Sequence, residues 1–388
     1  MSLAPPSSSA AWPATPSRPH STSQYWVLPT LAVATLLVAI GGGWDVSWHI
    51  TIGRDTFWTP AHMCIYLGGA TGGLLAGWLA IRATFLEPAE REGGVSLWGG
   101  YAPFGAWICI WGATAMLTSA PFDNWWHNAY GLDVKIISPP HVLLFLGTLT
   151  LRIGTWVLLL REQNRPSSPR SAPWLYSWVG GLLLGGTLWL FMSESWPTRQ
   201  HTFKYFNIVA IIAPFFLAAI GRSTKLRWAC TFAAGTDMLL HCAITWILPL
   251  FPASPHLGPI YNPVTHMVPP AFPQWIILPA IAFDLVRHKL PFDRQRLVLS
   301  LVLGLVFCAI FIPAQWWFAI FQLSPSADNW FFVGGRIWPY SSYPGDYWHE
   351  FAQGSGLGAL QIVRLGVTAM FTAFLGLYFG SFMSRVRR

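Results

Sequence analysis

Ten apolar runs, each close to twenty residues long, are the feature that most restricts how this chain can fold. A helix of about 20 apolar residues crosses the hydrocarbon core of a bilayer. Only 10% of the 388 residues are charged, whereas a soluble protein carries about 25%, so a soluble enzyme is excluded. The runs cover residues 25–44, 61–82, 98–119, 141–161, 174–193, 204–221, 228–251, 272–288, 297–320 and 357–384.

These runs predict an all-α polytopic transmembrane bundle of about ten helices. Residues 1–24 are rich in Pro, Ser, Thr and Ala and have little to bury, so we expect a disordered tail there. Residues 25–161 contain the first four helices, and residues 162–388 contain the other six with two outer loops at 252–271 and 321–356. The five cysteines lie in or beside apolar runs without a CxxC pair, so neither a disulfide framework nor a thiolate metal site is expected.

The basic residues indicate how the chain is oriented. Alternate loops carry two to four Lys or Arg each, and so does the C-terminus, whereas the opposite loops carry none to two. By the positive-inside rule both termini are predicted to be cytoplasmic. We therefore expect an integral, multi-pass protein of the plasma (inner) membrane whose partner is the lipid bilayer and not nucleic acid. The basic loops in question are 82–97, 161–173, 222–227 and 287–296.

Histidines gather on the predicted outer side of this topology. Only His20 and His288 fall on the cytoplasmic side. The other nine lie in outer loops or in the outer halves of helices: His49, His62, His127, His141, His201, His241, His256, His266 and His349.

Two outer hairpins repeat one string of residues. The first contains Asp45-x3-His49, Gly53-x-Asp55, Pro60-Ala61-His62 and Gly68. The second contains Asp123-x3-His127, Gly131-x-Asp133, Pro139-Pro140-His141 and Gly147, with one extra residue before its Pro-Pro-His step. Such internal similarity indicates a duplicated helix-loop-helix unit, formed by helices 1–2 and helices 3–4.

The repeated residues are suited to hold a metal ion. Asp and His four positions apart share one face if the first helix continues beyond the apolar boundary. His62 and His141 follow Pro at a helix start, where the helix dipole disfavours imidazolium and leaves a neutral ring able to donate a lone pair. Each hairpin therefore offers two imidazoles and one carboxylate, the ligand number of many catalytic metal sites. The metal ligands that we predict are Asp45, His49, His62, Asp123, His127 and His141.

The Asp-x3-His step occurs four times, against about 0.4 expected by chance. We expect the cytoplasmic pair, Asp284 and His288, to be a solvated surface pair. A third, weaker set consists of Asp237, His241 and His256, for which either an ion pair between Asp237 and Arg152 or a ligand or proton-relay role is open. His266 and the Asp346-x2-His349 step could cap the site, but interfacial anchoring is the preferred interpretation for both.

The spacing of the two hairpins resembles that of the C subunit of the copper membrane monooxygenases, the particulate methane and ammonia monooxygenases. That subunit has Asp-x3-His-x12-His at one copper site and Asn-x3-His-x13-His at its neighbour. Asp45, His49 and His62 fit the first spacing, and Asp123, His127 and His141 fit the second in the same order, with Asp123 in place of the Asn. The resemblance covers about forty residues, near a tenth of the chain.

This resemblance implies a membrane-embedded copper-binding oxidoreductase that hydroxylates a small substrate at an outward-facing site, with other subunits of a membrane oxidase complex as partners. Asp55 and Asp133 are the candidate catalytic residues, as groups that orient a ligating imidazole through its second nitrogen. Gly53 and Gly131 would let the loop backbone approach closely. Four Trp residues would either wall the site or anchor it at the interface: Trp48, Trp58, Trp125 and Trp126.

Two other classes of function remain open at this point. The same ligands could hold zinc in a membrane hydrolase that cleaves a lipid amide or ester, with Asp55 or Asp133 as the base. The chain could also be a non-enzymatic copper-binding or transport protein, although it has no Met-rich stretch, no CxxC pair and no GxxxxGK[ST] motif. Zinc gives no redox signal, so the metal content discriminates between the first two classes.

Overall fold

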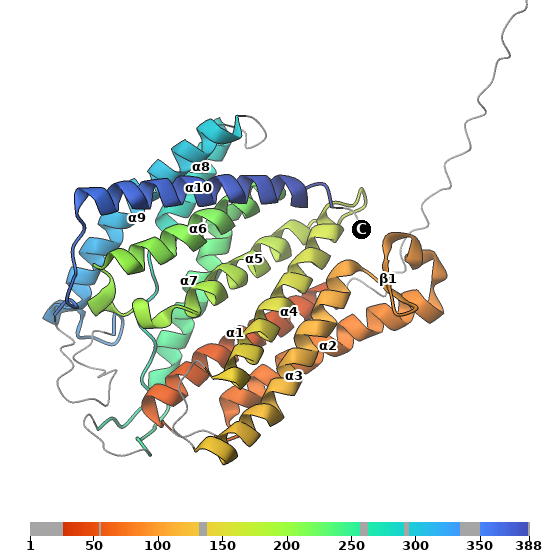
Figure 1. Cartoon of the computed structure of the whole chain (residues 1–388), viewed down its shortest axis with the longest axis horizontal. Coiled ribbons are helices and arrows are strands. Elements are labelled where there is room, and N and C mark those ends of the chain that lie inside the picture. Colours follow the sequence, from red (N-terminus) through yellow and green to blue (C-terminus); the bar gives the residue numbers. More distant parts are fainter. Residues whose placement is uncertain are drawn as a thin grey trace, which may run out of the picture.

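A computed structural model describes residues 26–53, 56–131, 138–256, 263–290, 295–333 and 350–386. Ten α-helices form most of this part of the chain (Figure 1). They are α1 (Val27–Thr51), α2 (Pro60–Ile81), α3 (Phe104–Tyr130), α4 (Pro139–Gln163), α5 (Ala172–Trp189), α6 (Phe203–Ser223), α7 (Ala229–Ile247), α8 (Ile277–Lys289), α9 (Arg296–Gln322) and α10 (Ala359–Met383).

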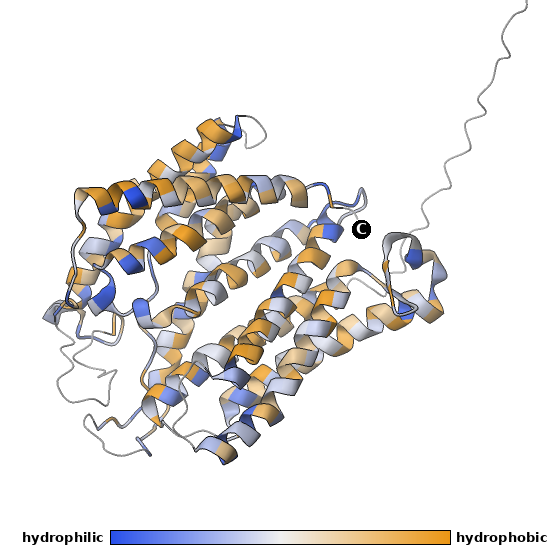
Figure 2. Ribbon diagram, in the orientation of Figure 1, coloured by the Kyte–Doolittle hydropathy of each residue, from blue (hydrophilic) through white to orange (hydrophobic). Residues whose placement is uncertain are grey.

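Seven of the described helices are long and apolar enough to cross a membrane: α1, α2, α4, α6, α7, α9 and α10. Apolar residues cover the helices along their lengths, and hydrophilic residues gather toward the two ends of the bundle (Figure 2). The all-α polytopic membrane fold predicted from the apolar runs is therefore confirmed. The span expected at 272–288 is shorter than predicted, because its first residues are not helical and α8 has only 13 residues.

One small element is a β-hairpin, which the sequence did not predict. Strands β1 (Val95–Leu97) and β2 (Gly100–Ala102) pair in antiparallel fashion in the loop between α2 and α3. Trp98 and Gly99 form its turn with positive φ angles of 49° and 80°. The hairpin lies at the opposite end of α3 from Asp123 and His127 and does not contribute to the candidate site.

The duplicated unit is visible in how α1 packs on α2 and α3 packs on α4. A Cβ on Gly68 would lie 2.7 Å from the Ala34 carbonyl oxygen and 3.0 Å from the Val38 nitrogen. A Cβ on Gly147 would lie 2.9 Å from both the Gly112 carbonyl oxygen and the Met116 nitrogen. The contacted residues hold matching positions in the two copies, so both hairpins use a glycine to bring their helices together.

The remaining helices build the larger core cluster. Helix α10 packs mainly on α6 and α9, and helix α8 packs on α7 and α9. Large apolar side chains such as Phe206, Phe283, Phe307 and Phe311 are fully buried between these helices. In Figure 1 this group lies beside the four helices of the duplicated unit, with α5 between them.

Hydrogen bonds between loops show that alternate loops meet at the same end of the bundle. At one end, Asn164 Nδ2 donates to the Val386 carbonyl (2.8 Å) and Gln163 Nε2 donates to the Ser223 carbonyl (3.0 Å). At the other end, the His256 N–H donates to the Ile52 carbonyl (3.0 Å). The grouping of the loops that we derived from their basic residues agrees with this geometry.

Candidate functional site

The first hairpin brings its Asp and both histidines together. Helix α1 continues past the apolar boundary as predicted, so that Asp45 and His49 lie one turn apart near its end. Asp45 Oδ1 lies 3.1 Å from His62 Nε2, and Asp45 Oδ2 lies 3.8 Å from His49 Nε2. One carboxylate thus lies between the two imidazoles, and its side chain is only 16% exposed.

His62 is held at the start of α2 by its neighbours. Thr59 is the N-cap residue and accepts a hydrogen bond from the His62 N–H (3.4 Å), and Pro60 occupies the first helical position. The His62 ring places Nδ1 3.0 Å from the Thr56 carbonyl oxygen. A carbonyl oxygen only accepts, so Nδ1 carries a proton and the tautomer of His62 is fixed.

The second hairpin repeats this arrangement. His127 Nε2 lies 3.3 Å from Asp123 Oδ2, and His141 Nε2 lies 3.5 Å from Asp123 Oδ1. Ser138 caps α4 as Thr59 caps α2, and it accepts from the His141 N–H at the same distance of 3.4 Å. The expectation that the metal-ligand candidates converge within each hairpin agrees with the structure.

The two hairpins also adjoin each other. The rings of His49 and His141 meet edge to face with centroids 6.2 Å apart, where α1 contacts α4. His141 contributes to the electrostatic environment of Asp45, although it belongs to the other hairpin. All six side chains therefore form a single cluster at one end of the bundle, which the sequence left undecided.

A loop from the other half of the chain covers the end of α1. Ser47 Oγ donates to the Val268 carbonyl (2.5 Å), and the Val268 N–H donates to Thr51 Oγ1 (2.8 Å). Ser47 and Thr51 are 0% and 2% exposed and flank His49 on the helix. These positioning residues were missed in the sequence, because no local pattern connects them with a loop more than 200 residues away.

Gly53 and Gly131 have a different role from the close approach that we expected. Their φ angles are +77° and +94°, and a Cβ on Gly131 would meet nothing within 4 Å. Both residues follow the last turn of a helix, and the Gly131 N–H donates to the His127 carbonyl (2.9 Å). Glycine is favoured at both positions because a positive φ ends the helix, and at Gly131 no neighbouring atom comes near enough to require it.

The Trp residues of the hairpins divide into two groups. Trp58 and Trp125 are 73% and 54% exposed, as expected of interfacial anchors rather than of walls of a site. Trp48 packs in a small apolar cluster with Trp44 and Trp189. Trp126 packs against Tyr130 in a tilted arrangement with ring centroids 4.4 Å apart.

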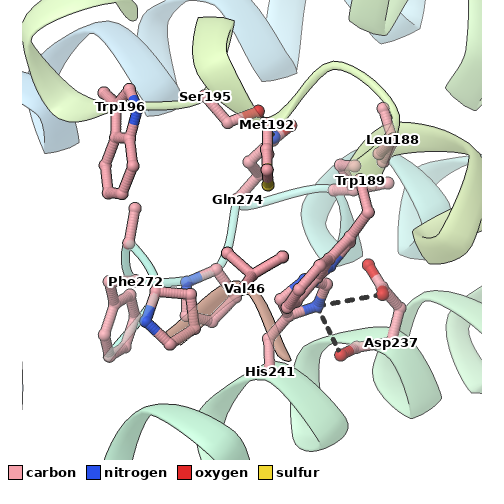
Figure 3. Close-up of a pocket in the computed structure, with 14 residues that line it drawn as sticks. Val46, Leu188, Trp189, Met192, Ser195, Trp196, Asp237, His241, Phe272 and Gln274 are labelled. Carbon is pink, nitrogen blue, oxygen red and sulfur yellow. Dashed lines mark hydrogen bonds and ion pairs between the residues drawn. The ribbon is translucent and has the colours of Figure 1, made fainter. Parts of the chain in front are cut away.

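The third set of candidates is only partly assembled. His241 Nδ1 lies 3.0 Å from Asp237 Oδ1, and the Trp189 indole N–H donates to His241 Nε2. These residues line a cavity of about 60 Å³ between α5, α7 and the 270–276 segment (Figure 3). His256 is exposed and does not line the cavity, so the set of three is not brought together.

Arg152 is not the ion-pair partner of Asp237. The described residues show no ion pair between them, and Asp237 pairs with His241 instead. Arg152 Nη1 lies 3.5 Å from Thr148 Oγ1, and its Nε is buried without a hydrogen-bond partner among the described residues. Gly185 and Gly186 explain the separation, because Asp237 packs against the first and the Arg152 guanidinium against the second.

The expectation for Asp284 was wrong. Asp284 is 0% exposed, and its carboxylate accepts from the Thr231 N–H (2.8 Å), the Thr231 hydroxyl (2.9 Å) and the Cys230 N–H (3.3 Å). It therefore caps the start of α7 from a neighbouring helix. His288 is exposed, and its Nε2 lies 3.0 Å from the Arg227 carbonyl oxygen, so the two residues do not form a surface pair.

The remaining candidates from the sequence are His266, Asp55, Asp133 and the Asp346-x2-His349 step. His266 is exposed, and its Nδ1 lies 2.9 Å from Thr265 Oγ1. Asp55 and Asp133, the candidate catalytic residues, and the Asp346 to His349 step lie outside the described residues.

The fit of a metal ion can be judged from the pairwise distances. Two donors at about 2.0–2.2 Å from one ion, at angles of about 90–110°, lie about 3.0–3.5 Å apart. Three of the four Asp–His distances, from 3.1 to 3.5 Å, fall in that range. Even so, within the described ranges no group of three or more His, Cys, Asp or Glu side chains is placed to hold an ion as it stands. The donors are of the right kind, and side-chain rotations are needed to bring three of them onto one ion.

Comparison with known proteins adds no further guide: no family model, no curated protein and no solved structure matches this chain.

Proposed function

We propose that this protein is a membrane-embedded copper-binding oxidoreductase that oxidises a small substrate at the cluster formed by its two acid-and-histidine hairpins. Its orientation in the plasma membrane, with cytoplasmic termini and the cluster facing outward, is part of the same proposal and rests on the distribution of Lys and Arg. The main support for the proposal is that both nitrogens of the His62 ring face hydrogen-bond acceptors.

His62 lies between two hydrogen-bond acceptors. Its Nδ1 faces the Thr56 carbonyl and its Nε2 faces the Asp45 carboxylate. A neutral imidazole carries only one N–H, so with Nδ1 protonated the Nε2 lone pair points at a carboxylate oxygen, which is repulsive. An imidazolium would satisfy both acceptors, but His62 stands in the first turn of α2, where the helix dipole disfavours it. A metal cation between Nε2 and the carboxylate removes the conflict, and an Nδ1–H bonded to a carbonyl is the usual support of a metal-bound histidine.

Copper is the ion that the donor set favours. Among the divalent first-row metals, Cu²⁺ binds most tightly to a site of given nitrogen and oxygen ligands. The ligands here are four imidazoles and two carboxylates, with no thiolate in the cluster, and the carboxylates offset the charge of the ion. When bound, copper would supply one-electron redox chemistry, which the side chains of the cluster do not have.

The chain's own residues would hold and shield such a site. Asp45 and Asp123 each lie between two imidazoles, so each can ligate or orient both. The Thr56 carbonyl fixes the His62 ring, and the Ser47–Val268–Thr51 hydrogen bonds hold the outer loop over the end of α1. Hydroxylation of a small substrate is the activity that the resemblance to the copper monooxygenases implies for this arrangement.

The metal content of the full chain tests the proposal. The protein is purified in detergent, loaded with Cu²⁺, desalted and measured by elemental analysis and electron paramagnetic resonance. We expect about one or two copper ions per chain and a signal with nitrogen hyperfine structure, since imidazoles are ligands. His62→Ala and His141→Ala each lose at least half of the copper, whereas His266→Ala, which removes an exposed histidine outside the cluster, keeps all of it.

Other outcomes have definite meanings. Zinc in place of copper, after growth with both metals, would favour the zinc-dependent hydrolase. Copper that binds without any oxygen consumption in the presence of a reductant would favour a copper-binding or transport protein. Wild-type protein that retains no more metal than the His62→Ala variant, while both remain folded, contradicts the proposal.

A further inference from the structure

The cavity beside Asp237 is lined by none of the six side chains of the histidine cluster and has its own chemistry. It is formed by the end of α5, the middle of α7, the loop after α5, the segment that precedes α8 and Val46 of α1, the residue next to Asp45 (Figure 3). Its walls are mainly apolar and aromatic, and they include Trp189, Trp196 and Phe272. Polar groups are contributed by Asp237, His241, Ser195 and Gln274.

Hydrogen bonding determines the charge of this cavity. The indole N–H of Trp189 can only donate, so His241 Nε2 accepts and its proton is on Nδ1, which faces Asp237 Oδ1 at 3.0 Å. His241 is therefore neutral and donates to the carboxylate of Asp237, a residue only 8% exposed. Apart from this pair, none of the 14 described residues that line the cavity has an ionisable side chain.

A second acceptor lies elsewhere in the lining. The amide of Gln274 donates through Nε2 to Ser195 Oγ (3.0 Å). Its Oε1 is buried and has no hydrogen-bond partner among the described residues. A buried acceptor without a partner is unfavourable, and a ligand that donates a hydrogen bond would satisfy it.

From these features we infer that the cavity is a binding site for a small organic cation of the alkylammonium type. The ammonium group would donate to Asp237 and Gln274, while its carbon atoms and its charge would lie against the faces of Trp189, Trp196 and Phe272, which attract cations. A cavity of 150 Å³ accommodates benzene, so one of about 60 Å³ has room for about two or three non-hydrogen atoms. Methylammonium and dimethylammonium are of this size.

Direct binding to the full-length protein tests the inference. Radiolabelled methylammonium is added to detergent-purified chain in a scintillation proximity assay, at constant ionic strength and with a chelator present so that the metal cluster plays no part. We expect saturable binding of about one ion per chain, with displacement by dimethylammonium. Neither methanol, which is similar in size but uncharged, nor an equal concentration of K⁺ should displace it.

Variants at two separate acceptors keep the test independent of any one folding defect. Asp237→Asn should weaken binding at least tenfold, and Gln274→Leu severalfold. Gln274→Glu, which adds a charge at the second acceptor, should tighten binding at least threefold. Glu350→Gln removes one exposed acid at the same end of the bundle outside the cavity and should leave binding unchanged.

Each result decides for or against the site. If Asp237→Asn does not fold, opposite effects of the two Gln274 variants still support it. The inference is wrong if folded wild-type protein shows no saturable binding, if K⁺ displaces methylammonium as well as dimethylammonium does, or if neither Gln274 variant changes the affinity.

Discussion

The contact between Gly147 on α4 and helix α3 gives a sharp test of how the second hairpin is built. A Cβ at position 147 would lie 2.8 Å from Met116 Cγ and 2.9 Å from both the Gly112 carbonyl oxygen and the Met116 nitrogen. Two of these three atoms belong to the backbone of α3, so a rotamer change cannot relieve the clash. Gly147→Ala must therefore push the two helices apart by about 0.5 Å to restore ordinary van der Waals contact.

Two effects of opposite sign determine the magnitude. Overpacking of a close contact costs about 1–3 kcal/mol. Replacement of Gly by Ala inside a helix contributes about 0.5–1 kcal/mol of stability. The expected net result for Gly147→Ala is a loss of about 1–2 kcal/mol in the free energy of unfolding. Gly77→Ala on α2 is the matched control, because a Cβ there meets nothing within 4 Å and only the favourable effect remains.

Unfolding by sodium dodecyl sulfate in mixed micelles, followed by circular dichroism, measures both variants under the same conditions. Because α3 carries Asp123 and His127 and α4 carries His141, separation of the helices should also lower the copper content of Gly147→Ala but not that of Gly77→Ala. If Gly147→Ala is as stable as Gly77→Ala, the close approach of the helices does not hold the hairpin together and the reasoning fails.

Three further predictions concern other parts of the chain. Asp284→Ala should lower the free energy of unfolding by about 2 kcal/mol in the same assay, because it removes the cap of α7 and leaves two backbone N–H groups without an acceptor. Thr51→Ala should cost about 1 kcal/mol and accelerate hydrogen exchange at the Val268 N–H, which donates to the Thr51 hydroxyl. Burial lowers the pKa of His201 below its usual 6.5, so the unfolded state binds the proton more readily, and stability should fall as the pH drops from about 7 to below that lowered pKa. His201→Phe should remove this pH dependence; an unchanged dependence would assign it to other groups.

The positions of the helices could be read from the sequence because hydrophobicity and helix signals agree along most of the chain. The run expected at 141–161 became α4 at Pro139–Gln163, and the run expected at 297–320 became α9 at Arg296–Gln322. Helix α3 shows the limit of this approach. It ends at Tyr130, well beyond the apolar run, because the polar turns that carry Asp123 and His127 continue the helix.

The convergence of each hairpin was also predictable, since a repeated string of residues at fixed offsets forces matching geometry. The contacts between residues far apart in the sequence were not predictable. Asp284 looked like an exposed partner of His288, whereas it reaches across to cap α7. Ser47 and Thr51 gave no local signal of their bond to Val268. Such contacts depend on how helices and loops pack in space. The spacing of residues along the chain does not predict that packing.

The Asp-x3-His step shows why spacing alone does not determine chemistry. In the first hairpin the Nε2 atoms of His49 and His62 face the carboxylate, and His62 Nδ1 is committed to the Thr56 carbonyl, so a cation between the groups would suit a neutral His62 ring. At His241 it is Nδ1 that faces the carboxylate, and Nε2 is committed to the Trp189 indole, so the ring is already satisfied. An Asp and a His in contact therefore favour a metal ion in one place. In the other they leave the carboxylate available to a ligand that donates hydrogen bonds. The difference lies in whether the second ring nitrogen of the histidine meets an acceptor or a donor.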